Sequence, residues 1–388
     1  MGLALPRRRD HPQASEPVRP LAVRRLMLTD FRCYARAILE TDPRPVVLTG
    51  PNAAGKTNLL EAISFLSPGR GLRGARVVEV DRIGGGPFAV AARIDGQDGP
   101  VEIGTGRQEA ERERRIVRID GADAPNQAAL AERMSIVWLT PAMDRLFQEG
   151  PGERRRFLDR LVMAGNPAHP RQSARYAHLL RERTRLLRAG RFEPAWLVSL
   201  ERRAAEAGVA IAAARRQSVA TLASALADEP GRFPRPDLRV AGEVEAWLDG
   251  RPAVEVEERF AEALAASRGR DAETGTTAVG PHRSDLLVWE GASGCPAGEC
   301  STGQQKALLI SMVLAEARVR AAEGGCLPVL LLDEVAAHLD RERRSDLFEE
   351  IAALGAQAWL TGTDAAVFAP FGERAQFFTV RDAILQAA

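Results

Sequence analysis

The sequence predicts an α/β fold, with mixed sheets and helices in the two terminal parts of the chain and a mostly helical second lobe inserted between them. A glycine-rich loop at residues 50–57 stands between an apolar strand and a helix. A second apolar strand, Val329–Leu332, ends in two carboxylates, Asp333 and Glu334. Between residues 153 and 270 the composition shifts to alanine, arginine, glutamate and leucine, which favour helix over strand.

Length and composition describe a globular chain of two lobes. The 388 residues suffice for a sizeable core, and 45% of them are apolar and 27% charged. The net charge of +1 excludes a globally basic nucleic-acid coat, so any DNA contact must use a local cluster of arginines. No apolar run approaches the roughly 18 residues that span a bilayer. We therefore expect a cytoplasmic protein with no membrane partner.

The N-terminal part of the chain predicts an arm followed by strands around the glycine-rich loop. Residues 1–20 hold three consecutive arginines and several prolines but no apolar stretch, and we expect a disordered arm there. In residues 21–152, strands are expected over Leu21–Phe31 and Val46–Thr49, the second leading into the loop. A helix is expected next, over Thr57–Leu66, because a proline and a glycine stop it.

Along the remainder of the chain, the expected secondary structure changes twice, from strands to helices and back to strands and loops. Glycine-rich alternating stretches after the first helix are consistent with a β-layer. Residues 153–275 form the expected helical lobe, with helices over Arg171–Leu187 and Leu197–Ala227 and a segment rich in helix breakers at Asp228–Pro236. Residues 276–388 return to strands and loops around one further helix.

The glycine-rich loop matches the Walker A pattern G-x-x-x-x-G-K-[ST] in full. Its residues are Gly50, Pro51, Asn52, Ala53, Ala54, Gly55, Lys56 and Thr57. In such a loop the backbone N–H groups converge on phosphate oxygens, and the helix that follows adds its positive end. Lys56 is expected to reach the β- and γ-phosphates, and the Thr57 hydroxyl to ligate Mg²⁺. The loop predicts binding of ATP with Mg²⁺.

Lysine is almost absent from this chain, since only Lys56 and Lys306 occur among 53 lysines and arginines. Arginine serves wherever a plain positive charge suffices, but its planar guanidinium does not replace a compact ammonium between phosphates. The two lysines therefore mark informative positions. Lys306 ends the run Ser301-Thr302-Gly303-Gln304-Gln305-Lys306, which is similar to the signature motif of ABC-type ATPases.

The signature-like run has a structural and a functional interpretation. Ser301 and Gln304 form a capping-box pattern, which by itself only opens a buried helix. Alternatively, Ser301 Oγ and the Gly303 N–H form an anion site for a γ-phosphate. In the ABC-type ATPases that the run resembles, the signature of one protomer completes the ATP site of another. Cys300 and Thr302 depart from the usual Leu-Ser-Gly-Gly-Gln.

The apolar strand that ends in two carboxylates is typical of a Walker B motif. Asp333 is expected to hold Mg²⁺, and Glu334 to orient and deprotonate the attacking water. Taken alone, two adjacent carboxylates are as well explained by a solvated turn. The Walker A loop upstream and the signature helix immediately before the strand favour the catalytic interpretation.

Six short motifs follow one another along the chain. They are Asp30-Phe31-Arg32, Phe157-Leu158-Asp159, Gly280-Pro281-His282-Arg283-Ser284-Asp285, Gly303-Gln304-Gln305-Lys306, Asp333-Glu334-Val335-Ala336-Ala337-His338-Leu339-Asp340 and Thr361-Gly362-Thr363. In this order and spacing, the set resembles the RecF family of bacterial recombinational repair proteins, from about Leu21 to the C-terminus.

This resemblance implies an ABC-type P-loop ATPase head similar to SMC heads. It implies that ATP joins two heads into a homodimer, that the dimer binds DNA at single-strand/double-strand junctions, and that RecO and RecR act with it to load RecA. Weak, DNA-stimulated hydrolysis would reset what is chiefly an ATP-switched DNA-binding protein. By the same resemblance Asp340, in the D-loop, and Thr363 approach the nucleotide. The segment Ser135–Pro141, where relatives approach the site, holds no Q-loop glutamine.

Three other functions share a P-loop. An ATPase subunit of a membrane ABC transporter would have a histidine just after the strand that follows Walker B, where this chain reads Thr361-Gly362-Thr363. A P-loop kinase for a small acceptor would need no signature helix. A pure ATP-switched binding module would not need Glu334 as a base. Dimerisation with ATP but not with ADP distinguishes these alternatives.

Contact with DNA phosphates requires a local arginine cluster. Arg70, Arg73 and Arg76, in the glycine-interrupted segment after the P-loop helix, are candidates. They are equally well explained as ordinary surface arginines. In that case the arginines of the helical lobe are the alternative DNA surface.

Overall fold

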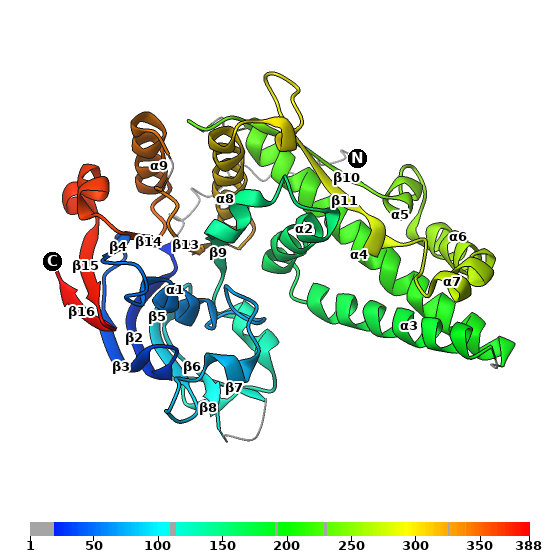
Figure 1. Ribbon diagram of the computed structural model, residues 1–388, viewed down its shortest axis with the longest axis horizontal. Helices are drawn as coiled ribbons and strands as arrows, with labels where there is room; N and C mark the ends of the chain where they lie inside the picture. Colours follow the sequence, from blue (N-terminus) through cyan, green and yellow to red (C-terminus); the bar gives the residue numbers. More distant parts are fainter. Residues whose placement is uncertain (1–18, 109–113, 191–192, 229–230, 325, 338) are drawn as a thin grey trace, which may run out of the picture.

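The computed structural model describes residues 19–108, 114–190, 193–228, 231–324, 326–337 and 339–388. Figure 1 shows a head built on two sheets and a helical lobe that extends from it. An α/β head with an inserted, mostly helical lobe is the fold class that the sequence predicts.

The main sheet of the head has six strands in the order β16-β15-β4-β14-β13-β9. The five strands from β15 to β9 run parallel, and the edge strand β16 is antiparallel to β15. Their bounds are Val46–Thr49 for β4, Ile136–Leu139 for β9, Val329–Leu332 for β13, Ala358–Gly362 for β14, Gln376–Arg381 for β15 and Ile384–Ala387 for β16. The central strands are covered on both faces, which explains their nearly continuous apolar sequences.

The alternation of side chains along these strands divides the head into two hydrophobic cores. On one face, Leu331 of β13 packs with α1 (Lys56–Ser64) and the second sheet. On the other face, Leu330 and Leu332 pack with α8 (Thr302–Gly324) and α9 (Arg341–Leu354). The P-loop helix is thus held between two sheets.

The second sheet is antiparallel, with strand order β3-β2-β5-β6-β7-β8. Its strands are β2 (Ala22–Phe31), β3 (Tyr34–Glu40), β5 (Ala89–Gly96), β6 (Gly99–Arg107), β7 (Arg115–Ile119) and β8 (Ala122–Asp123). It provides the β-layer expected from the alternating stretches after the P-loop helix.

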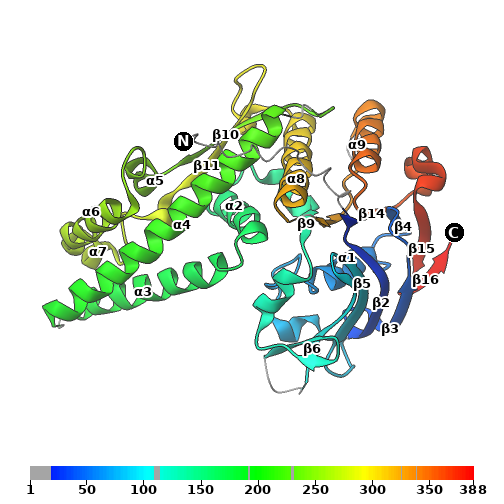
Figure 2. The ribbon, with the colours of Figure 1, turned by 180° about the vertical axis from the view of Figure 1, so that it is seen from behind.

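The helical lobe has a hydrophobic core of its own. Its helices are α2 (Pro151–Gly165), α3 (His169–Ala189), α4 (Pro194–Asp228), α5 (Glu243–Trp247), α6 (Ala253–Ala266) and α7 (Arg268–Thr274). Strand β10 (Pro236–Ala241) pairs antiparallel with β11 (Asp285–Glu290) beside α4. Figure 2 shows α3 and α4 along the length of the lobe, with α6 and α7 at the end far from the head.

A fully buried arginine joins four elements of this lobe. Arg183 of α3 donates to Glu201 at 3.0 Å and to Asp271 at 2.7 Å. Its second Nη group donates to the carbonyl of Leu264 at 2.6 Å. Two carboxylates and a carbonyl thereby satisfy a guanidinium with no exposed surface, which is the arrangement that makes burial of a charge tolerable.

Short elements complete the fold. Strand β1 (Arg19–Pro20) pairs parallel with β12 (Cys326–Leu327). The 3₁₀ helices are η1 (Val77–Val80), η2 (Gln127–Glu132), η3 (Pro141–Arg145), η4 (Pro281–Arg283), η5 (Ala297–Glu299) and η6 (Ala365–Arg374). Most of the expected N-terminal arm, residues 1–18, lies outside the described residues. Its last two residues are not disordered, because they pair with β12. Among the helices described, none is long and apolar enough to cross a membrane.

Candidate nucleotide-binding site

The P-loop connects β4 to α1, as its motif predicts, and two glycines are required by the backbone. Gly50 has φ of 148° and Gly55 has φ of 115°. A Cβ atom at Gly50 would lie 2.1 Å from the carbonyl oxygen of Val380, and one at Gly55 would lie 2.6 Å from the Tyr34 hydroxyl. Both the dihedral angle and the close approach therefore exclude a side chain at these positions.

The interior of the loop is occupied by the Lys56 ammonium. Its Nζ donates to the carbonyl oxygens of Gly50 and Pro51, each at 2.8 Å. The residue is 4% exposed. Burial lowers the pKa of Lys56, and the negative charges of Glu334 and Asp333 oppose that shift. The ammonium is thus held between two backbone carbonyls, within the electrostatic influence of the two carboxylates.

The remaining P-loop residues differ in exposure. Pro51, Asn52 and Ala53 lie at the surface of the loop, whereas Ala54 is buried. The carbonyl of Ala54 accepts the N–H of Ala383, in the turn between β15 and β16, at 3.1 Å. The exposed half of the loop is the part free to face a ligand.

Thr57 and Asp333 meet at the carboxyl ends of β4 and β13. Thr57 Oγ1 lies 2.9 Å from Oδ1 and 3.1 Å from Oδ2 of Asp333. A hydroxyl and a carboxylate are both hard oxygen donors of the kind that Mg²⁺ prefers. The two predicted metal ligands are thus side by side, and their chemistry fits that ion.

A residue that sequence reasoning missed completes this cluster. Thr361, at the end of β14, donates its hydroxyl to Asp333 Oδ1 at 2.8 Å. The Thr361 Oγ1 oxygen also accepts the backbone N–H of Glu334 at 2.8 Å. Thr361 therefore fixes both the carboxylate of Asp333 and the backbone that carries Glu334. The predicted Thr363, two residues later, is exposed and makes no hydrogen bond to any described residue.

Glu334 stands on an unusual backbone. Its φ of 49° places a residue with a large side chain in the left-handed region. This conformation costs on the order of 1–3 kcal/mol, and the surrounding structure must impose it. The hydrogen bond from its N–H to Thr361 is one of the contacts that do so.

The signature-like run begins α8 with the predicted capping box. Gln304 N donates to Ser301 Oγ at 3.3 Å, and Ser301 N donates to Gln304 Oε1 at 2.9 Å. Ser301 and Gln304 are exposed, and a Cβ atom at Gly303 would lie 3.0 Å from a guanidinium nitrogen of Arg343. Within the described residues, no hydrogen bond or ion pair joins this end of α8 to the P-loop, and its Ser301 and Gln304 face solvent.

The second lysine ties the signature helix to the loop after Walker B. Lys306 is 5% exposed, and its Nζ donates to the carbonyl of Ala337 at 2.7 Å. Asp144 Oδ2 lies 3.4 Å from the same nitrogen. Asp340, further along that loop, caps α9 by accepting the Arg343 N–H at 2.8 Å and is exposed. Lys306 thus links the segments that hold the predicted signature and D-loop.

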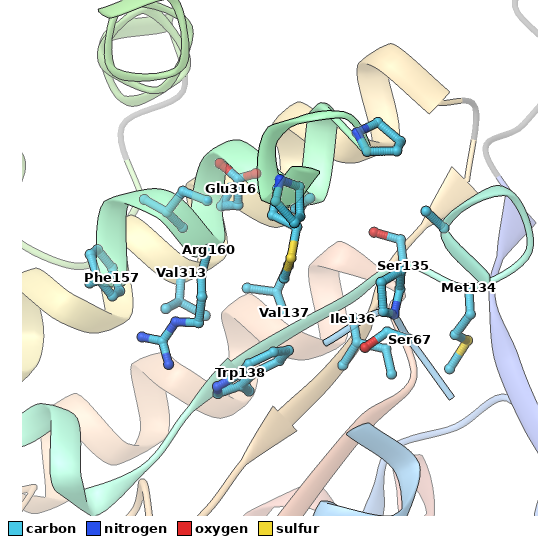
Figure 3. Close-up of a pocket in the computed structure, with 17 residues that line it drawn as sticks. Ser67, Met134, Ser135, Ile136, Val137, Trp138, Phe157, Arg160, Val313 and Glu316 are labelled. Atoms are coloured by element: carbon cyan, nitrogen blue, oxygen red, sulfur yellow. The ribbon is translucent and has the colours of Figure 1, made fainter. Parts of the chain in front are cut away.

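A pocket between β9, α2 and α8 lies against the edge strand β9 of the main sheet (Figure 3). The Arg160 guanidinium of α2 is 5.4 Å from the ring centroid of Trp138, a residue of β9, and 5.5 Å from that of Phe157. Glu316 of α8 also lines the pocket. This stacking connects α2 of the helical lobe to β9. Strand β9 pairs with β13, the strand that ends just before Asp333.

Comparison with known proteins identifies the family. Residues 22–384 match the RecF/RecN/SMC N terminal domain. A DNA replication and repair protein RecF from Mesorhizobium japonicum is 51% identical over 362 residues, which cover 92% of this chain and 96% of that protein. The chain belongs to the RecF family. Another RecF, from Agrobacterium fabrum, is 48% identical over 365 residues, covering 93% and 97% of the two chains.

Solved structures agree with the RecF-family fold. One described as the recombination mediator protein RecF-ATPrS in the RecFOR pathway superposes with a TM-score of 0.83 at 23% identity, covering 96% of this chain and 99% of that one. An SMC head bound to the C-terminal winged-helix domain of ScpA matches with a TM-score of 0.52 at 14% identity, covering 94% and 96%. At these identities the likeness concerns the fold.

Two of the motifs that resemble those of RecF lie in the helical lobe. Asp159 of α2 accepts Arg215 Nε at 2.8 Å and lies 2.8 Å from His169 Nε2. Arg215 also donates to the carbonyl of Pro281 at 2.6 Å, and His282 Nδ1 lies 2.9 Å from the Tyr176 hydroxyl. In this RecF-family chain, these motifs connect α2, α3 and α4 to the segment before β11.

Proposed function

We propose that this chain is an ATP-switched DNA-binding protein of recombinational repair and replication-fork maintenance. One observation supports it most: Lys56, Thr57, Asp333 and Glu334 gather at one end of the main sheet, while the signature end of α8 is exposed and forms no hydrogen bond or ion pair with them among the described residues. An exposed signature run that has no such contact with the P-loop of its own copy suits an arrangement in which two copies join head to head. RecF relatives named for DNA replication and repair support the biological role.

Each residue of the site has a proposed task. The exposed P-loop backbone binds the phosphates of ATP, and Lys56 contacts the β- and γ-phosphates with its ammonium. Thr57 and Asp333 hold Mg²⁺, which neutralises charge on the phosphate oxygens when bound. Glu334 accepts a proton from the attacking water. Hydrolysis is expected to be slow and stimulated by DNA.

The trans half of the site belongs to a second copy. Ser301 Oγ, the Gly303 N–H and the Gln304 side chain offer donors at the start of α8 for a γ-phosphate bound by the partner copy. Asp340 and Thr363, both exposed, are proposed to lie near the same interface. Arg343, whose guanidinium lies against Gly303, must move or contribute its charge when the two heads meet.

The proposed partners follow from the family. ATP-bound dimers bind DNA at single-strand/double-strand junctions in the cytoplasm, and RecO and RecR act with them to load RecA. A RecF solved with ATP is described as part of the RecFOR pathway, which supports this assignment.

The test combines sedimentation with DNA binding. With ATP the purified chain should sediment as a dimer, and with ADP or no nucleotide as a monomer. Gapped duplex should bind more tightly than blunt duplex, and only in the ATP state. A chain that remains monomeric with ATP, or binds DNA equally in all three states, would contradict the proposal. An ATPase subunit of a transporter or a P-loop kinase would show neither ATP-dependent DNA binding nor a preference for gaps.

A further inference from the structure

A groove in the helical lobe is lined by four arginines. It lies between the C-terminal half of α3 and the segment that follows α7, and its volume is about 620 Å³. Arg181, Arg185 and Arg188 come from α3, and Arg283 comes from the far side of the groove. No carboxylate lines it among the residues described. Figure 1 places this end of α3 far from the head.

The three arginines of α3 form a row. Their spacing of four and three residues puts them on one face of the helix, and all three are exposed. Arg188 lies at Gly275, where a Cβ atom would be 1.7 Å from its Nη2. Gly275 ends α7 with φ of 69°, so a glycine there both turns the chain and leaves space for the guanidinium.

The charges of this row are mostly uncompensated. Arg185 forms a surface pair with Glu182 at 2.8 Å, in which the two side chains are 68% and 33% exposed, and such a pair is weak. Arg181 and Arg188 have no hydrogen bond or ion pair with any described residue. Other arginines of the same lobe form an ion pair with a carboxylate; for example, Arg216 Nη2 lies 2.5 Å from Asp249 Oδ1.

Arg283 is held in place by a neutral group. Its Nε and Nη2 donate to the carbonyl of Thr277 at 3.1 and 3.0 Å, which orients the guanidinium without neutralising it. Burial lowers the pKa of the neighbouring His282, and the charges of Arg283 and Arg155 act in the same direction. The side of the groove opposite α3 therefore presents an oriented, permanently charged donor next to a histidine that favours its neutral form.

We propose that this groove binds the phosphodiester backbone of DNA. The inference rests on the proposed DNA-binding function and assigns it a surface. Guanidinium groups present paired donors that match phosphate oxygens. Arg181 and Arg188 are about 10 Å apart along the helix axis, a length that covers about three phosphates of one strand. A cluster of like charges with few counter-charges is stabilised when a polyanion binds.

The segment after the P-loop helix is a weaker candidate for this role. Arg73 Nη1 donates to Asn58 Oδ1 at 2.8 Å and to Glu61 Oε2 at 3.0 Å. Glu61 is completely buried, and Arg32 pairs with it as well. Arg73 is therefore engaged in satisfying a buried carboxylate and is poorly placed to give its charge to DNA.

The test replaces the row by glutamine, as Arg181→Gln, Arg185→Gln and Arg188→Gln together in the full chain. Binding of a labelled gapped duplex is measured by fluorescence anisotropy over a range of NaCl concentrations, with ATP and with ADP. Each lost phosphate contact lowers the slope of log affinity against log salt by about 0.9. The triple variant should lose roughly two to three units of slope with ATP, and Arg283→Gln about one.

A matched control removes the same charge elsewhere in the lobe. Arg202, Arg203 and Arg251 are exposed and form no ion pair within the described structure, so their triple glutamine variant should retain the wild-type slope. Replacement of the α3 row by lysine should restore most of the slope, because lysine keeps the point charge. Circular dichroism and ATP-dependent dimerisation, unchanged in both triple variants, establish that the fold and the head are intact.

Two outcomes would contradict the assignment of DNA binding to this groove and leave the proposed function standing. A wild-type slope in the α3 variant would do so, and an acidic protein segment would then be the better occupant. An equal loss in the control variant would show a general effect of charge. If the wild-type chain does not bind DNA with ATP, both the groove and the proposed function fail.

Discussion

Thr361 Oγ1 lies 2.8 Å from Oδ1 of Asp333 and, at the same distance, accepts the backbone N–H of Glu334. One hydroxyl thus positions the expected metal ligand and the backbone of the expected base. It orients the two groups proposed to act on the nucleotide, so Thr361 is assigned as a positioning residue.

Thr361→Val should lower kcat for ATP hydrolysis about 10-fold or more while the Kd for ATP changes little, because an isosteric side chain removes only the orienting hydrogen bonds. Thr29→Val is the matched control, since Thr29 of β2 is exposed and its side chain makes no hydrogen bond to a described residue. Steady-state ATPase assays and a fluorescent-nucleotide titration separate the two effects. An equal loss of kcat in Thr29→Val and Thr361→Val would contradict the positioning role of Thr361.

Lys56→Arg should largely abolish ATP turnover and leave the fold intact. The ammonium fits between the carbonyls of Gly50 and Pro51, each 2.8 Å away, and a planar guanidinium does not. Thermal melting should show an unfolding transition close to that of the wild type. Wild-type turnover in this variant would disprove the assigned role of Lys56.

Ser301→Arg should bind ATP as a monomer but fail to dimerise, because a bulky cation fills the place of the partner's γ-phosphate. Mixing it with Lys56→Ala tests the trans arrangement. A mixed dimer has one site with both lesions and one with neither, so ATPase activity should reappear, at up to about half the wild-type value per dimer. Demonstrated heterodimers without any recovery would count against a site shared between copies.

Lys306→Met should weaken ATP-induced dimerisation more than ATP binding. The variant keeps a long apolar stem but leaves the Ala337 carbonyl and Asp144 without their ammonium partner. We expect a loss of about 1–3 kcal/mol in the free energy of unfolding. Lys306→Arg, which retains the charge, should be milder. Equal losses in monomer affinity for ATP and in dimerisation would argue against a link from signature to D-loop.

Glu316→Gln should change how stability depends on pH. Burial raises the pKa of Glu316 to about 7, although Arg320 Nε lies 2.8 Å from its Oε1. The folded state therefore holds a proton that the unfolded state, with a carboxyl pKa of about 4.3, has released.

This contribution of Glu316 is fully present below about pH 4 and is lost as the pH rises toward 7. The glutamine variant should lack that decline, so its stability relative to wild type should rise between pH 5 and 8 by on the order of 1–3 kcal/mol. Denaturant unfolding at several pH values measures it. Parallel stability curves for the two proteins would contradict the raised pKa.

Contiguous motifs were the part of the site that the sequence could predict. The P-loop and the capping box of Ser301 and Gln304 depend on local backbone geometry, and the structure has both. Thr361 could not be chosen over Thr363 from the sequence. Pairing of Leu332 with Leu360 in the β13–β14 register puts Thr361 next to Asp333, and register is not visible in either strand alone.

The arginine contacts, like the strand register, depend on tertiary structure that the local sequence does not reveal. Arg73 was a reasonable candidate for DNA, because it stands in a glycine-interrupted segment. Its partner Glu61 lies 12 positions earlier on the buried side of α1, so the ion pair depends on how the segment folds back on that helix. The row on α3 was open to prediction from its helical spacing, but the lack of counter-charges around it needed the tertiary structure.

At position 334, the residue that best fits the left-handed backbone differs from the residue that the proposed chemistry needs. Glycine adopts φ of 49° without strain, so Glu334→Gly should relieve on the order of 1 kcal/mol and raise the melting temperature. The same change removes the carboxylate proposed to activate water. Selection of this protein for heat resistance alone would therefore favour loss of the proposed ATPase activity, so a variant library needs a functional screen beside the thermal one.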